Sequence, residues 1–283
     1  MDEVAQRGVR AVLADIGGHL APGRDDLPLV ARDPAPSLAP PPDVDGPLLL
    51  GAVYEATLAP SDRRRNGAYY TPGPMAAGLA GVAVRVAGAS ARVWDPAAGG
   101  GALLVAAMRA LVAAGADPAH VVAHQLGGVD TDPVAIDVAT TALGIASGAT
   151  PLGLRVGDGL DVPSGPCDVV IANPPFRGQM KTGTARTRAH ADRLAARFGD
   201  AASGYTDDAA LFLLAAVRGV REGGVVAFVL PAPLLATRDA RPVREEVGAR
   251  TSLVRLWSVP TAGFDAGVRV VLAVARKDAD AGP

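Results

Sequence analysis

The residues with the most specific chemistry lie in the segment 171–176, which reads Ile-Ala-Asn-Pro-Pro-Phe. Asn173 offers an amide oxygen and an amide NH2 group at one point. Pro174 and Pro175 fix the backbone and leave carbonyl groups without competing local donors, and the aromatic Phe176 follows at stacking distance. Such a corner can hold a planar amino group between two acceptors and stack on its ring. A structural turn could also contain Asn-Pro, but the longer pattern favours a binding site.

A glycine-rich turn covers residues 95–101, which read Asp-Pro-Ala-Ala-Gly-Gly-Gly, between an expected strand and an expected helix. Glycines at such a place permit a tight turn and a close approach of a ligand to the backbone. A plain tight turn is the alternative interpretation. The segment lacks the Lys-Ser/Thr pair of a phosphate-binding P-loop, which counts against an NTPase.

Two further acidic residues follow the next two expected strands. Asp130 ends one of them, where a carboxylate can accept hydrogen bonds from both ribose hydroxyls of an adenosine-containing cofactor. Asp158, between Gly157 and Gly159, could accept from an adenine amino group, although such a tripeptide is more often a turn. Asp132 is expected to be only the N-cap of the helix that follows.

The elements that position these residues alternate between strand and helix. Strands that alternate with helices imply a parallel sheet covered on both faces, with ligands beyond the carboxyl ends of its strands. The last two expected strands have no helix between them, which suggests an antiparallel hairpin at the end of the sheet. The expected strands are 92–95, 121–130, 152–156, 168–172, 225–230, 253–258 and 268–275, and the expected helices are 3–14, 48–58, 101–114, 132–145, 207–221 and 241–249.

Composition excludes several classes of protein. A single cysteine, Cys167, excludes a disulfide scaffold and a cysteine-cluster zinc site, and four scattered histidines give no metal site. No apolar run is long enough to span a membrane, and the N-terminus is acidic where a signal peptide would be basic. We therefore expect a cytoplasmic protein, with Cys167 as a small buried residue.

The charge is unevenly distributed along the chain. Residues 1–60 hold 4 basic and 9 acidic residues, so a total of −2 averages an acidic head with a mildly basic remainder. The proline-rich residues 21–47 are expected to form an extended linker, which makes 1–47 an extension and 48–283 the catalytic domain. The segment 177–197 has a net charge of +5 and is either a phosphate-contacting segment or a solvated loop. The run Arg63-Arg64-Arg65 is likewise either a phosphate contact or a charged surface turn.

In this order, the motifs resemble the DNA adenine-N6 methyltransferases of the gamma arrangement, which include type I modification subunits and single-chain type II enzymes. The similarity runs from residue 48 to residue 277. Residues 50–55 (Leu-Gly-Ala-Val-Tyr-Glu) resemble the family's entry helix, 67–72 (Gly-Ala-Tyr-Tyr-Thr-Pro) its methionine-side motif, 95–101 its S-adenosylmethionine loop, and 173–176 its catalytic tetrad. Later segments at 207–212, 223–224, 230–231 and 263–264 are similar to the family's remaining elements.

The resemblance implies a Rossmann-like, S-adenosylmethionine-dependent methyltransferase with a mostly parallel seven-stranded sheet. It implies that Asn173 and the Pro174 carbonyl accept from the target amino group, while Phe176 stacks on a base extruded from DNA. Transfer is then an in-line displacement that depends on positioning and polarisation and needs no metal. The implied cofactor residues are Tyr70, Thr71 and Pro72 at the methionine end, Asp95, Ala97, Gly99 and Gly101 along the middle, Asp130 at the ribose and Asp158 at the adenine; Pro175 completes the tetrad.

The sequence also departs from the family. Ala98 and Gly100 replace the usual Cys and Ser, and Phe176 replaces the commoner Tyr. We expect no substantial target-recognition domain, so that specific reading of DNA needs a specificity subunit or a nuclease partner, or does not occur. Two alternatives stay open: a methyltransferase of the same fold acting on a protein glutamine or a small metabolite, and a non-catalytic binding subunit. The Tyr54-Glu55 and 69–72 segments favour DNA.

Overall fold

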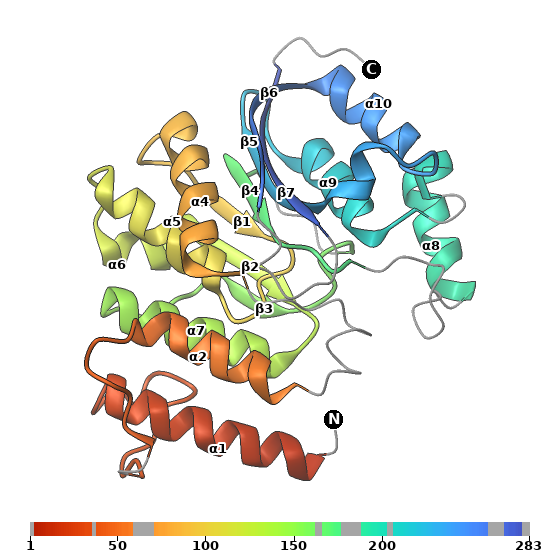
Figure 1. The fold of residues 1–283 in the computed structure, drawn as a ribbon. Helices are drawn as coiled ribbons and strands as arrows, with labels where there is room; N and C mark the ends of the chain where they lie inside the picture. Colours follow the sequence, from red (N-terminus) through yellow and green to blue (C-terminus); the bar gives the residue numbers. More distant parts are fainter. Residues whose placement is uncertain are drawn as a thin grey trace.

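Seven strands form one sheet in the computed structural model of this chain, which describes residues 3–35, 38–58, 71–161, 166–176, 188–202, 206–259 and 269–278. Their order is β3-β2-β1-β4-β5-β7-β6 (Figure 1). Strands β1 to β5 pair in parallel, and β7 pairs antiparallel with both β5 and β6. The mostly parallel sheet with an antiparallel C-terminal hairpin is thereby confirmed. The strands are β1 (Val93–Asp95), β2 (Leu126–Asp130), β3 (Leu154–Val156), β4 (Val169–Ala172), β5 (Val225–Pro231), β6 (Thr251–Ser258) and β7 (Val270–Lys277).

Helices cover both faces of this sheet. On one face lie α4 (Gly73–Ala87), α5 (Ala102–Ala113) and α7 (Pro133–Ser147), and on the other lie α8 (Arg188–Phe198), α9 (Asp208–Gly219) and α10 (Arg241–Arg250). The short α6 (Pro118–His120) and the π-helical turn η2 (Val121–Gln125) precede β2, and the strand expected within residues 121–130 is Leu126–Asp130. The 3-10 turns η3 (Gly199–Ala202) and η4 (Ala232–Leu235) complete the set of described elements.

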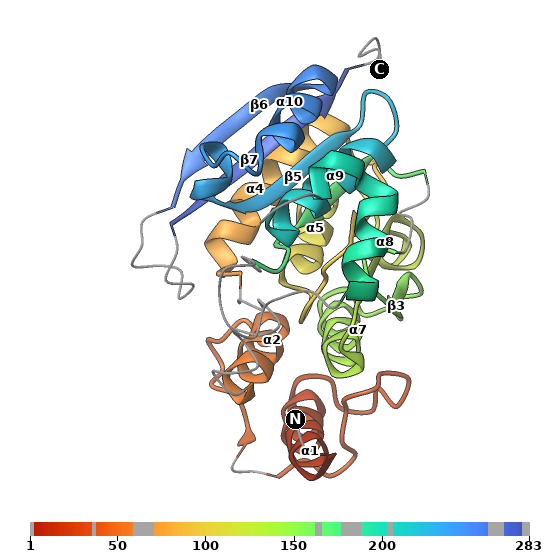
Figure 2. The same cartoon turned by 90° about the vertical axis from the view of Figure 1, so that its right-hand side faces the viewer.

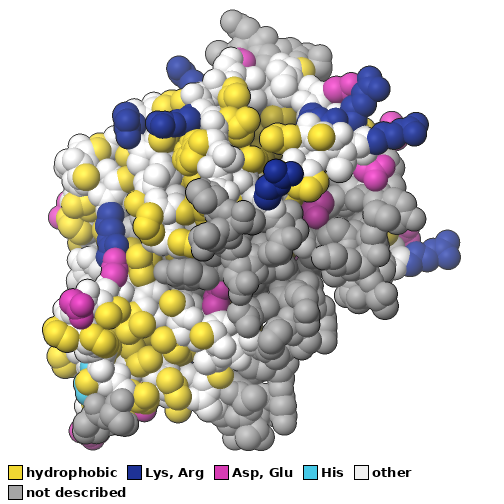
Figure 3. Space-filling model, viewed as in Figure 1, with side chains coloured by type: hydrophobic (Ala, Val, Ile, Leu, Met, Phe, Trp, Pro, Cys, Tyr) yellow, Lys and Arg dark blue, Asp and Glu magenta, His cyan; other side chains and the backbone are white. Residues whose placement is uncertain are grey.

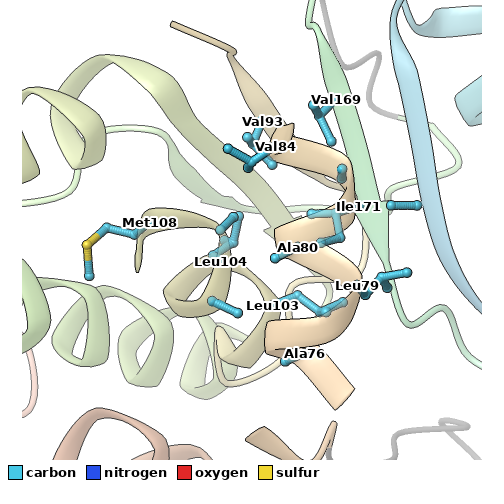
Figure 4. Packing of buried hydrophobic residues seen from close by; sticks show 14 of the residues in the cluster. Ala76, Leu79, Ala80, Val84, Val93, Leu103, Leu104, Met108, Val169 and Ile171 are labelled. Atoms are coloured by element: carbon cyan, nitrogen blue, oxygen red, sulfur yellow. The ribbon is translucent and has the colours of Figure 1, made fainter. Parts of the chain in front are cut away.

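The central strands are buried on both faces, as their continuous apolar sequences require. In β4, Val169 and Ile171 point to the α4–α5 side, while Val170 and Ala172 point to the α8–α9 side. Figure 4 shows Leu79 and Val84 of α4, together with neighbours from α5, packed against Val93, Val169 and Ile171. This packing holds the carboxyl ends of β1 and β4 side by side, with Asp95 at the end of β1 and Asn173 directly after β4.

The N-terminal segment packs onto the rest of the protein. Helix α1 (Glu3–Leu20) lies beside α2 (Gly46–Thr57) and α7 (Figure 2). Leu29 is 2 % exposed and joins a core with Leu13 and Leu50, and its backbone N–H donates to Thr141 Oγ1 over 3.2 Å. The extended linker expected for 21–47 is therefore wrong where the structure describes this segment, because its leucines find apolar partners on α2 and α7. The boundary at residue 47 stays a prediction.

None of the helices within the described ranges combines the length and the apolar character needed to cross a membrane.

Candidate active site

A pocket opens at the carboxyl edge of the sheet, with about 1150 Å³ of space, part of it open to solvent. Because the strands lie in the order β3-β2-β1-β4, the residues at their carboxyl ends lie side by side in the same order. Along that row come Asp158 after β3, Asp130 at the end of β2, Asp95 at the end of β1 and Asn173 after β4. All four line the pocket, as do four other residues expected at the site: Thr71, Ala97, Gly99 and Pro175.

The glycine-rich turn joins β1 to α5 and forms the floor of the pocket. Gly99 and Gly101 have φ values of 50° and 84°, a left-handed conformation that glycine adopts without strain. Gly100 lies against α2: a Cβ at this position would be 2.8 Å from Gly51 Cα. Helix α2 therefore rests directly on the turn, and a larger residue at position 100 would separate them.

Asp95 is a fully buried acid in the wall of the pocket. Its side chain is completely buried, and Oδ1 accepts from the Ala97 N–H over 2.9 Å. Oδ2 has no hydrogen-bond partner among the described residues. Burial raises the pKa of Asp95 to about 8, and the nearby charge of Asp130 adds to this rise. A buried carboxylate oxygen without a donor suits a ligand that brings a donor or a positive charge.

Asp130 and Asp132 form an acidic pair that is tied to three elements. The two carboxylate oxygens of Asp130 accept from the N–H groups of Gly99 and Asp132, each over 2.9 Å. Asp132 caps α7 through the Val134 N–H, over 2.8 Å, which confirms its expected role. Its second oxygen accepts from the hydroxyl of Tyr54 on α2 over 2.6 Å, a contact that the sequence did not predict. Burial is the main cause that raises the pKa of both Asp130 and Tyr54.

Asn173 lies at the turn after β4, where the pocket continues past the acidic row. Its Nδ2 group donates to Thr71 Oγ1 over 3.0 Å. Pro175 lines the pocket beside it, whereas Phe176 is half-buried against the core on the α4–α5 side. Among the expected site residues that the structure describes, Pro72, Gly101, Pro174 and Phe176 do not line the pocket; Pro72 and Gly101 instead cap the starts of α4 and α5.

Sequence reasoning missed several lining residues. Tyr54 and Glu55 were known only as part of an entry-helix motif, and the roles of Asp208 and His190 were not predicted. Asp208 is 3 % exposed at the start of α9. An acidic residue in the first turn of an otherwise apolar helix was the sequence signal that could have identified it. Tyr70, Arg63-Arg64-Arg65, the segment 177–187 and residues 263–264 lie outside the described residues. Cys167 is buried, at 4 % exposed, as expected.

A comparison with protein families shows which family the chain belongs to. A family model described as N-6 DNA methylase matches residues 47–277. The chain belongs to the N-6 DNA methylase family. Its family and its methyltransferase fold make S-adenosylmethionine the cofactor of this chain.

Solved structures show the fold of this N-6 DNA methylase in other proteins. A protein from Listeria monocytogenes, described as a class I S-adenosylmethionine-dependent methyltransferase, matches 99 % of this chain and 90 % of its own, with 18 % identity and a TM-score of 0.64. A protein from Vibrio vulnificus, described as a modification subunit of a type I restriction enzyme, matches 84 % of this chain and 50 % of its own, with 22 % identity and a TM-score of 0.60.

A third protein, described as the methyltransferase subunit of a type I restriction-modification system from Streptococcus thermophilus, matches 81 % of this chain and 49 % of its own. The identity is 20 % and the TM-score is 0.57. The chain thus spans most of the Listeria protein but about half of the two type I subunits. These likenesses confirm the Rossmann-like methyltransferase fold. Among curated proteins, no sequence match was found.

Proposed function

We propose that this N-6 DNA methylase transfers a methyl group from S-adenosylmethionine to the N6 amino group of adenine in DNA. One observation carries the proposal: the order of Asp158, Asp130, Asp95 and Asn173 along the carboxyl edge of the sheet. An adenosyl cofactor laid along this row meets acceptors for its adenine, its ribose and its cationic part in turn. The amide of Asn173 then follows at the end where the methyl group is delivered.

The pocket fits this cofactor. The unpartnered Oδ2 of Asp95 suits a positively charged or N–H-bearing group. The glycine-rich turn leaves room for the middle of the ligand beside Ala97 and Gly99, and Gly101 gives the turn its left-handed bend. A carboxylate has about four lone-pair sites, so Asp130 can accept from ribose hydroxyls beyond the two backbone N–H groups it already holds. We assign Tyr70, Thr71 and Pro72 to the methionine end and Asp158 to the adenine. When bound, S-adenosylmethionine supplies an electrophilic methyl group.

Asn173 and the carbonyl of Pro174 polarise and orient the target amino group, whose nitrogen accepts the methyl group. Because the Asn173 NH2 group donates to Thr71, the amide oxygen is the side that meets the target amino group. We assign the carbonyl of Pro174 as the second acceptor, with Pro175 holding the turn. Two acceptors on one amino group draw electron density onto its nitrogen and orient it for in-line attack. This arrangement needs no side chain that forms a covalent intermediate.

DNA and a second subunit are the partners that we propose. We assign Phe176 to stacking on the extruded adenine, which offsets the cost of unstacking that base, a few kcal/mol. On the face shown in Figure 3 the described Lys and Arg side chains are spread over the upper part and the margins of the molecule, with Asp and Glu side chains among them. The Vibrio and Streptococcus proteins are subunits of type I systems, so we place residues 48–283 as a catalytic domain that works with a specificity subunit or a nuclease.

The experiment is a methyl-transfer assay with radiolabelled S-adenosylmethionine, DNA and the purified protein, followed by nucleoside analysis. We expect label in N6-methyladenine, its loss in Asn173→Ala, and an unchanged affinity of that variant for S-adenosylmethionine by calorimetry. Leu152→Ala, at a side chain that is 70 % exposed, is the control that retains activity. Label that enters protein glutamine or a small molecule, and never DNA, would overturn the proposal.

A further inference from the structure

Helix α2 forms a wall of the cofactor pocket although it precedes all of the strands. Its residues Gly51, Tyr54 and Glu55 and its C-cap residue Leu58 line the pocket, and Gly51 lies against Gly100 of the glycine-rich turn. Tyr54 is 4 % exposed, with its ring in the core that α1, α2 and α7 share. The ring therefore packs away from solvent while the hydroxyl reaches a polar partner.

The hydroxyl of Tyr54 starts a continuous chain of hydrogen bonds that ends in the glycine-rich turn. It donates to one oxygen of Asp132 over 2.6 Å. The backbone N–H of Asp132 donates to Asp130 over 2.9 Å, and the Gly99 N–H donates to the other oxygen of Asp130 over 2.9 Å. Each bond joins a different element, so the chain links α2, the start of α7, the end of β2 and the turn after β1.

We infer that Tyr54 is a positioning residue for S-adenosylmethionine: its hydroxyl holds the Asp132–Asp130 pair and, through this pair, the glycine-rich turn in the conformation that binds the cofactor. The inference rests on the cofactor role assigned to Asp130 in the proposed function. Without the hydroxyl, the half-buried carboxylate of Asp132 loses its donor from α2 in the pocket wall, and a hydrogen bond to a charged acceptor contributes more than one between neutral groups. The pair then relaxes toward water or toward another donor, and the turn moves with it.

Tyr54→Phe tests this step because it removes one hydroxyl and keeps the buried ring. Thr57→Val is the matched control: it also removes one hydroxyl from α2, but Thr57 Oγ1 donates to the Tyr54 carbonyl of its own helix, over 2.5 Å, and does not line the pocket. Calorimetry with S-adenosylmethionine alone measures the affinity without any need for methyl transfer. We expect Tyr54→Phe to bind about tenfold more weakly and Thr57→Val to bind within about twofold of the natural protein.

Turnover separates positioning from a general loss of structure. At saturating S-adenosylmethionine, kcat of Tyr54→Phe stays within about twofold of the natural protein, while KM for the cofactor rises with the dissociation constant. The inference is overturned if both variants bind equally well, or if Tyr54→Phe loses kcat with unchanged affinity. A natural protein that binds no S-adenosylmethionine would overturn the proposed function as well, and one that binds it without methylating DNA would overturn only the proposed function.

Discussion

The side-chain NH2 group of Asn173 donates a hydrogen bond to the hydroxyl oxygen of Thr71, 3.0 Å away. Thr71 precedes α4 and is 5 % exposed, whereas Asn173 follows β4. A side-chain amide carries its donors on one side and its acceptor on the other. The bond to Thr71 therefore selects which side of the Asn173 amide faces the pocket.

Thr71→Val removes this acceptor and keeps the shape of the side chain. We expect kcat for methyl transfer to fall about tenfold, because one hydrogen bond of about 1 to 1.5 kcal/mol no longer orients the amide. Thr71→Ser keeps the hydroxyl and should stay within about threefold of the natural protein. Equal turnover of the Val and Ser variants in a single-turnover assay would show that the bond does not orient Asn173.

The pKa of Asp95 predicts how stability depends on pH. Burial raises this pKa to about 8, against about 4 in an unfolded chain. Between these values the folded protein binds more protons than the unfolded one, so the free energy of unfolding falls as pH rises from about 4 to about 8. The slope from this one group is at most about 1.4 kcal/mol per pH unit, and Asp95→Asn should abolish it.

Thermal unfolding in the absence of cofactor, followed between pH 5.5 and 8.5, measures this slope. Asp45→Asn is the control, since the Arg109 guanidinium holds the pKa of Asp45 below its usual value. Asp45 is thus ionised throughout this range in both states, and its variant should keep the slope of the natural protein. The assignment fails if the Asp95→Asn variant retains the full pH dependence.

The residues that end strands could be predicted from the sequence, and contacts between distant segments could not. Asp95, Asp130 and Asn173 each follow a short apolar run, because a strand buried on both faces is apolar until it leaves the core. The caps Asp132 and Asp207 were equally visible, since each precedes an apolar helical pattern. The bond from Tyr54 to Asp132 joins residues 78 positions apart, and no local pattern signals it.

Three elements show why the rest was missed. Helix α4 contains three glycines among its small residues, and glycine is a poor helix former, so its sequence gives only a weak helical signal. Helix α8 lies in a basic segment, and only Leu194 and Phe198, four residues apart, are buried to hold it. The proline content of 21–47 suggested a linker, but prolines do not prevent a neighbouring leucine such as Leu29 from packing on α2 and α7.

Gly100→Ala should weaken both stability and cofactor binding. The added Cβ would lie 2.8 Å from Gly51 Cα and 3.3 Å from Val138, and the backbone of α2 cannot move without disturbing the turn. We expect a loss of about 1 to 3 kcal/mol in the free energy of unfolding and an affinity for S-adenosylmethionine lowered at least about tenfold. Urea unfolding and calorimetry measure the two effects.

Gly81→Ala is the matched control for this substitution. Gly81 lies inside α4, and a Cβ there has no atom within 4 Å. Alanine in the interior of a helix is more favourable than glycine by about 0.5 to 1 kcal/mol, so this variant should be slightly stabilised and bind the cofactor normally. If both variants are stabilised, α2 does not rest on the glycine-rich turn.

Leu29→Ala tests whether the N-terminal segment unfolds together with the sheet. Leu29 is 2 % exposed among residues of α1, α2 and α7, so its truncation should lower the free energy of unfolding by about 2 to 5 kcal/mol. Leu152→Ala makes the same chemical change at a side chain that is 70 % exposed and should stay within about 0.5 kcal/mol. A single urea transition, shifted only in Leu29→Ala, would show that residues before 47 belong to the cooperative unit that positions Tyr54. If the two variants unfold at the same urea concentration, this segment opens independently of the sheet.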